Sequence, residues 1–142
     1  VFRTTILILE DGNRRIQAVD VSGNPVMQFD NQTSSTIDLS AMENDPSAVV
    51  YLDIAVEGLG YMYVLSYTDG GMAVDDYRLD IYEPDGSFLL RKTGVAAARM
   101  AVDTFRNVYT LNYETIAGAP RKEPSLSQWL PSTPNACPTP TS

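Results

Sequence analysis

The sequence predicts an all-β protein, and three observations support this prediction. Short runs of β-branched and apolar residues alternate with Gly, Asp and Asn turns. The repeated strands are apolar or aromatic at successive positions, so both of their faces are suited to burial. The segment at 53–67 also recurs at 99–113, an offset of 46 (99 minus 53). The residues that are identical in both copies are Ala55/Ala101, Val56/Val102, Tyr63/Tyr109, Leu65/Leu111 and Tyr67/Tyr113.

A period of about 40 to 50 residues made of short strands is typical of propeller blades. We therefore expect β-propeller-like, four-stranded antiparallel blades over residues 1–131. One blade is complete (49–92) and two are partial (1–30 and 97–131). A propeller needs at least about four blades to close, so we expect this chain to be a segment of a larger propeller.

The first partial blade is predicted as a meander of three strands. Residues 4–10 form the first strand, and Asp11-Gly12-Asn13 supplies a strong hairpin signal before a second strand at 14–21. Residues 25–29 are predicted as the third strand. Aligning 15–20 with 78–83 assigns these strands to positions two to four of a blade, so the first strand is missing.

The long polar stretch at 30–46 is predicted to connect this unit to the complete blade, with one helical turn near 37–42. The four strands predicted for the complete blade are 49–56, 61–68, 77–83 and 87–92. Short turns at 57–60 and 84–86 join the first to the second strand and the third to the fourth, and a loop at 69–76 lies between the second and the third.

The second partial blade begins at Ala97 and contains the second copy of the repeat. A loop at 116–124 and a third strand at 126–131 are predicted to follow. No fourth strand is recognisable, because residues 132–142 are rich in Pro, Thr and Ser and are predicted to form an extended linker or stalk. The ten predicted strands thus fall into sheets of three, four and three.

The second copy of the repeat, Ala101-Val102-Asp103-Thr104-Phe105-Arg106-Asn107-Val108-Tyr109, resembles the NHL-type repeats of six-bladed propellers. Those repeats carry an apolar-Val-Asp-x-x-Gly-Asn-Val-Tyr-Val motif in their first two strands. Arg106 stands where that motif has Gly, and Glu57 stands for its Asp in the earlier copy. The resemblance covers about residues 49–131, and it implies a binding scaffold rather than a particular reaction.

The second strand of each repeat predicts how the blades pack. Tyr63, Leu65 and Tyr67 share one face of a strand, because successive side chains point to opposite faces. Tyr109, Leu111 and Tyr113 are the corresponding residues in the second copy. We expect Tyr63, Leu65, Tyr109 and Leu111 to be buried between sheets.

The composition excludes several classes of function. Ten Lys plus Arg against 18 Asp plus Glu give a net charge of −8, which repels the phosphates of nucleic acid. The chain has no His, which removes His-based acid–base chemistry and Ser-His-Asp triads. Its single cysteine, Cys137, cannot form an internal disulfide, so a free or intermolecular thiol is predicted. No apolar run is long enough for a membrane-spanning helix.

Candidate site residues are expected on the rim of the blades that carries the long segments at 30–46, 69–76 and 116–124, opposite the rim of the short turns, because function concentrates on the loops of a rigid scaffold. Asp69, Asp75 and Asp76 are interpreted first as solvated loop charges; the alternative is that they supply oxygen ligands to a hard cation such as Ca²⁺ or act as an acid pair. Arg121 would bind an anionic group, or simply form part of a charged loop tip. Asn31 begins a glycosylation sequon in a surface loop.

These observations favour a non-enzymatic interaction or structural module, secreted or exposed at a cell surface and without a cofactor. The alternative is a portion of a propeller-type lyase or hydrolase that uses the acidic residues of the long-loop rim. In either case we expect other segments or copies to complete the propeller. Their strands should lie beside residues 4–10 and 126–130, and some sequence is expected to precede Val1.

Overall fold

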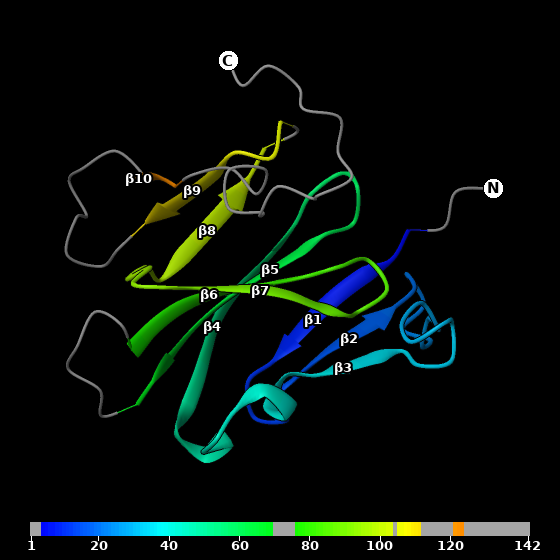
Figure 1. Ribbon diagram of the computed structural model, residues 1–142. Coiled ribbons are helices and arrows are strands. Elements are labelled where there is room, and N and C mark those ends of the chain that lie inside the picture. Colours follow the sequence, from blue (N-terminus) through cyan, green and yellow to red (C-terminus); the bar gives the residue numbers. More distant parts are fainter. Residues whose placement is uncertain (1–3, 70–75, 104, 112–120, 124–142) are drawn as a thin grey trace, which may run out of the picture.

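The computed structural model describes residues 4–69, 76–103, 105–111 and 121–123 (Figure 1). Within these residues the chain is built of antiparallel β-sheets with two short 3-10 helices. The sheets have three, four and three strands and are called here the first, central and third sheets. The predicted all-β class and the predicted division into sheets are confirmed.

The first sheet has the order β1-β2-β3, with β1 at Ile6–Glu10, β2 at Arg15–Val19 and β3 at Thr36–Asp38. The predicted hairpin is confirmed, because Glu10 pairs with Arg15 and the Arg14 amide donates to the Asp11 carbonyl across the turn at 3.2 Å. The prediction of a third strand at 25–29 is wrong. That segment makes only isolated bridges at Pro25 and Phe29, since proline has no N–H for a ladder.

The predicted connection at 30–46 therefore contains the actual third strand. The chain reverses through three consecutive residues with left-handed backbone, Asp30, Asn31 and Gln32, whose φ angles are 52°, 55° and 63°. Asn31 is exposed there, as expected for a surface loop. After β3 come the 3-10 helices η1 (Leu39–Met42) and η2 (Pro46–Ala48), so the predicted helical turn is confirmed at the first of them.

The central sheet has the order β4-β5-β6-β7, with strands at Val49–Val56, Met62–Thr68, Tyr77–Tyr82 and Phe88–Thr93. These bounds lie within one residue of the predicted ones. Each strand pairs antiparallel with the next, and β4 carries an irregularity between Tyr51 and Asp53. The sequence alone therefore located this sheet.

The third sheet has the order β10-β9-β8, with β8 at Arg99–Val102, β9 at Val108–Leu111 and β10 at Arg121–Glu123. Residues 121–123 were expected in a loop, and this prediction is wrong because they pair antiparallel with 108–110. The strand expected at 126–131, the tail at 132–142 and Cys137 lie outside the described residues.

Both faces of the central sheet are covered by apolar residues. Met62 and Val64 face the first sheet, where they join Ile16 and Ala18 in one buried cluster. The alternate side chains of the same strand, Tyr63 and Leu65, face the third sheet in a second cluster. That second cluster is completed by Leu79, Ile81, Val95, Ala97 and Val108. The central sheet is thus the middle layer of three.

The expected burial of the equivalent Tyr and Leu residues between sheets is confirmed in the first copy of the repeat only. Tyr63 and Leu65 are 0% exposed, whereas Leu111 is 40% exposed and Tyr109 is half-buried. Val108 is the counterpart of Met62, and it faces the sheet that precedes it in the same way. Leu111 is the counterpart of Leu65, and no described sheet follows the third one to cover it. The expectation was wrong because burial depends on a neighbouring layer.

The turns at 57–61, 83–87 and 103–107 lie at one end of the sheets, here called the turn rim. Gly60 packs beside Pro84, and the Arg106 guanidinium pairs with Glu57. The loop after β2 also reaches this rim, because the Asp30 amide donates to the Asp85 carbonyl at 3.0 Å. The stretch at 30–46 was placed wholly on the opposite rim by the sequence, but it crosses between rims since it includes β3.

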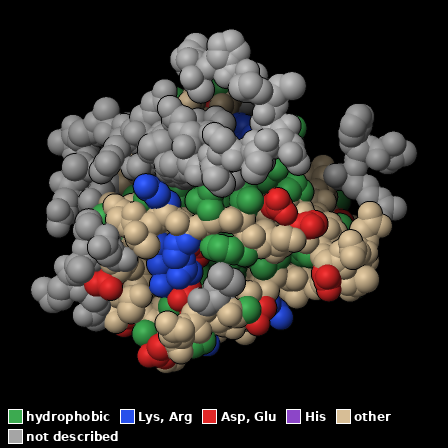
Figure 2. Space-filling model, in the orientation of Figure 1, with side chains coloured by type: hydrophobic (Ala, Val, Ile, Leu, Met, Phe, Trp, Pro, Cys, Tyr) green, Lys and Arg blue, Asp and Glu red, His purple; other side chains and the backbone are tan. Residues whose placement is uncertain are grey.

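The surface drawn in Figure 2 mixes acidic, basic and hydrophobic side chains over the described part of this face. Within the described residues, no helix has the length and apolar character required to cross a membrane.

Candidate functional site

The predicted acidic site lies only partly within the described residues. Asp69 is exposed directly after β5, Asp76 is half-buried directly before β6, and Asp75 lies outside the described residues. Arg121 begins β10 in a different sheet. The described residues contain no group of three or more acidic, His or Cys side chains suited to a metal ion. A Ca²⁺ site at these positions therefore stays a prediction.

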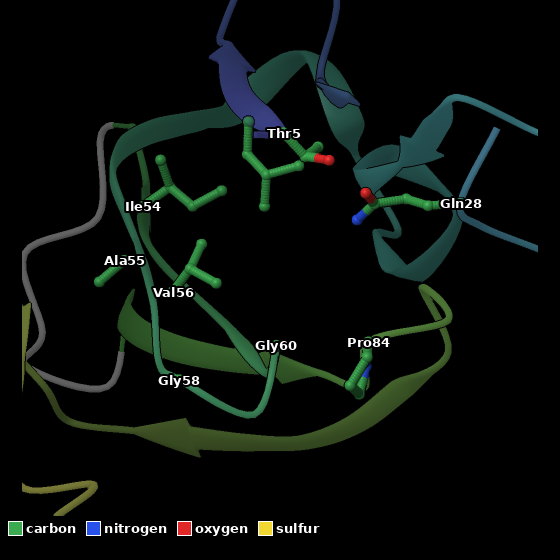
Figure 3. Close-up of a pocket in the computed structure, with 9 residues that line it drawn as sticks. Thr5, Gln28, Ile54, Ala55, Val56, Gly58, Gly60 and Pro84 are labelled. Carbon is green, nitrogen blue, oxygen red and sulfur yellow. The ribbon is translucent and has the colours of Figure 1, made fainter. Parts of the chain in front are cut away.

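A cleft of about 570 Å³ lies at the turn rim between the first sheet and the central sheet (Figure 3). Thr5 and Leu7 line it from the first sheet, and Ile54 and Val56 line it from β4. Gln28 and Pro84 lie on the side opposite Ile54 in Figure 3. Its walls combine aliphatic side chains with polar backbone groups, one hydroxyl and one amide, and no charged side chain of the described residues lines it, so it suits an extended polypeptide segment better than a charged ligand.

The strands that border this cleft are edge strands. β1 is the outer member of the order β1-β2-β3, and β4 is the outer member of the central sheet. β4 contacts β1 on one side and β8, the edge strand of the third sheet, on the other. Figure 1 shows the three sheets spreading away from this group of strands. The cleft therefore lies where free sheet edges converge.

A buried ionic cluster connects the segment after η1 to the central sheet. Arg91 on β7 contacts Glu43 at 2.6 Å and Asp80 at 2.7 Å, and Arg78 on β6 contacts Glu43 at 3.1 Å. The Glu43 and Asp80 side chains are only 5% and 3% exposed. The hydrogen bond that Arg91 donates to the Asp80 carboxylate raises the pKa of Arg91 above its ordinary value. Two cations and two carboxylates balance one another here, so this cluster holds elements together.

A second ion pair links the central and third sheets at the turn rim. Arg106 pairs with Glu57, whose side chain is fully buried, and its guanidinium lies 4.7 Å from the centre of the Tyr61 ring. Arg106 has left-handed backbone with φ of 67°, where the repeat motif has glycine. The larger residue thus provides a contact between two sheets that glycine could not provide.

Tyr63 lies beside this pair with a hydroxyl that is buried and makes no hydrogen bond of normal geometry within the described residues. Burial, together with the negative charge of Glu57, raises the pKa of Tyr63 to about 12. The hydroxyl is enclosed between sheets, so it is a packing feature rather than a group presented to a ligand.

Sequence reasoning missed the residues that line the cleft, because Leu7, Ile54 and Val56 look like ordinary strand residues. One signal did indicate the place. The missing first strand of the opening unit predicted a partner strand beside residues 4–10, which is the side of the first sheet that borders the cleft.

Comparisons with known proteins add no family to this description. No family model, curated protein or solved structure matches the chain.

Proposed function

We propose that this chain is a non-enzymatic interaction or structural module made of propeller-like blades, which other polypeptide segments complete. The observation that carries the proposal is the stacking of three antiparallel sheets through a central sheet that is apolar on both faces. A sheet with one solvated face would alternate apolar and polar residues instead. The layered arrangement supports blades of one larger assembly.

The orientation of equivalent residues gives further support. Met62 and Val64 face the preceding sheet, and their counterpart Val108 also faces the sheet before it. In the opening unit, Ile16 aligns with Leu79, and each of them faces the sheet that follows. Successive sheets therefore present the same face to the same neighbour, as repeated blades do.

The two outer layers explain why partners are part of the proposal. Ile6 and Ile8 are 43% and 42% exposed on the face of the first sheet that points away from the central sheet. Leu111 is exposed on the outer face of the third sheet. Apolar residues at both ends of a stack suit contact with further protein layers.

Sedimentation and chemical denaturation of the isolated chain test this proposal. We expect concentration-dependent association that Ile8→Lys reduces, because Ile8 lies on the uncovered face. Val21→Lys is the matched control, since Val21 is 75% exposed in the turn after β2. A monomer at all concentrations that unfolds in one highly stable transition would contradict an incomplete stack and favour a self-contained β-sandwich.

The extracellular or surface setting follows from the resemblance to NHL-type repeats. Protease treatment of intact source cells that carry an epitope-tagged version of the polypeptide tests it. Loss of the tag is expected, and full retention in intact cells, with loss after lysis, would contradict a surface location.

A further inference from the structure

We propose that the free edge of β1, together with the adjoining cleft, binds one extended strand of another polypeptide, which runs antiparallel to β1 and has apolar side chains facing β4. This inference rests on the proposed interaction function and specifies the partner. Such binding is β-augmentation, in which backbone hydrogen bonds supply affinity and side-chain pockets supply specificity.

The edge of β1 has the properties of an acceptor. Within the described residues, β1 forms a backbone ladder with β2 alone. Its apolar residues lie on both faces: Leu7 and Leu9 pack on the core, while Ile6 and Ile8 are exposed. A five-residue edge strand with four apolar residues, whose outward N–H and C=O groups pair with no other described strand, is a template for pairing with another strand.

Strand direction fixes how the added strand runs. The turn after β1 lies beside the start of β4, because the Asp11 carboxylate accepts from the Tyr51 amide at 2.9 Å. The end of β4 leads into the turn rim, where Thr5 at the start of β1 lines the cleft beside Val56. β1 is therefore antiparallel to β4, and a strand antiparallel to β1 runs parallel to β4.

The third sheet gives an example within this molecule of a strand in the equivalent position. β8 is the edge strand of its sheet, pairs antiparallel with β9, and packs against β4. The Asp53 carboxylate on β4 accepts from the Met100 amide on β8 at 2.8 Å. A strand added to the edge of β1 would pack against β4 in the same way that β4 packs against β8. The cleft lies at that position.

The repeat favours a single strand over a sheet edge of a second copy, because the first sheet aligns with strands two to four of a blade and only one strand remains to be added. Ile54 and Val56 bound the cleft on one side, with Gln28 and Pro84 on the opposite side (Figure 3). A second copy would bring a whole sheet with its loops to this edge, whereas the place equivalent to β4 takes one strand. An extended segment with valine- or leucine-sized side chains fits between the walls of the cleft.

The test uses the full chain and a synthetic peptide that copies residues 49–56, flanked by lysines for solubility. This segment is β4, the strand that holds the equivalent place in the central sheet. Amide hydrogen exchange measured with and without peptide, at concentrations where the chain is monomeric, should show at least about tenfold slower exchange at alternate amides of residues 6–10. The same peptide with one central residue replaced by proline is the control for the probe.

Two variants locate the binding place. Val56→Lys puts a charge into the cleft from a residue that is already 44% exposed, so peptide affinity should fall by about tenfold or more. Leu59→Lys changes a residue in the adjacent turn that is 68% exposed, and it should leave the affinity unchanged.

Several outcomes would overturn the inference. Peptide binding that leaves residues 6–10 unprotected, or that Val56→Lys does not weaken, would place the strand elsewhere. Faster exchange in β5 would mean that the peptide replaces β4. Protection of residues 6–10 without peptide in a dimer would make a second copy the occupant. Each of these results leaves the layered interaction module itself intact, so it is distinguishable from failure of the proposed function.

Discussion

Replacing Leu65 and Leu111 by alanine in separate variants measures whether the neighbouring sheet decides burial. The two residues are equivalent in the repeat, but Leu65 is 0% exposed and Leu111 is 40% exposed. Leucine to alanine removes three carbon atoms, each contributing about 0.8 kcal/mol when buried. At Leu65 this gives about 2.4 kcal/mol, and the unfilled cavity adds roughly 1 kcal/mol. At Leu111 we expect about 1 kcal/mol, because water fills the vacated space.

Urea denaturation followed by far-ultraviolet circular dichroism measures both losses in the free energy of unfolding. The comparison is valid if the slope with denaturant stays the same in the two variants and the parent. The chain should be studied at low concentration, since association would cover Leu111. Equal losses at the two positions would refute the layered packing, as would a larger loss at Leu111.

Three further predictions concern charged and titrating groups. Arg106→Gly should cost about 1 kcal/mol less in unfolding free energy than Arg106→Ala, because the φ of 67° at this position is unfavourable for alanine but not for glycine. Paired urea titrations measure this difference, and equal costs would mean that the turn relaxes. Burial raises the pKa of both Tyr51 and Tyr63 from 10.0 to about 12, so their stabilising contribution is complete below pH 10 and is lost as the pH rises through the folded-state pKa. Unfolding free energy should therefore fall across this range, and Tyr63→Phe should flatten the decline; an unchanged profile in that variant would contradict the assignment. Arg91→Met should cost about 3 kcal/mol in unfolding free energy, because it leaves Asp80 buried without its cation. Urea titrations measure this cost, and a loss below about 1 kcal/mol, as for an exposed ion pair, would argue against the ionic role.

Local pattern predicted the central sheet well. The alternation of apolar residues between glycine-containing turns located β4 to β7 within one residue, and the apolar character of both faces predicted neighbours on each side. The Asp11-Gly12-Asn13 turn likewise predicted the β1–β2 hairpin. These features succeed because turn geometry and side-chain alternation act over a few residues.

Pairing partners were harder to predict. Residues 25–29 were predicted as a strand and 36–38 as part of a polar connection, but the left-handed turn at 30–32 and the missing N–H of Pro25 direct the later segment onto β2. Residues 121–123 looked like a charged loop, yet their backbone pairs with β9. Short strands carry little information of their own, and tertiary context selects among them.

The sequence by itself determined that this chain is all-β and that its sheets come as three, four and three strands. That a further strand belongs beside residues 4–10 stays a prediction. Only the tertiary structure decided that Leu65 is buried whereas its counterpart Leu111 is exposed. It also decided which arginines pair with Glu43 and Glu57, and where the cleft lies between β1 and β4. The physical reason is the distance along the chain over which each interaction acts. Alternation and turns depend on neighbours in the chain, whereas burial, ion pairs and clefts depend on layers that come together from distant segments.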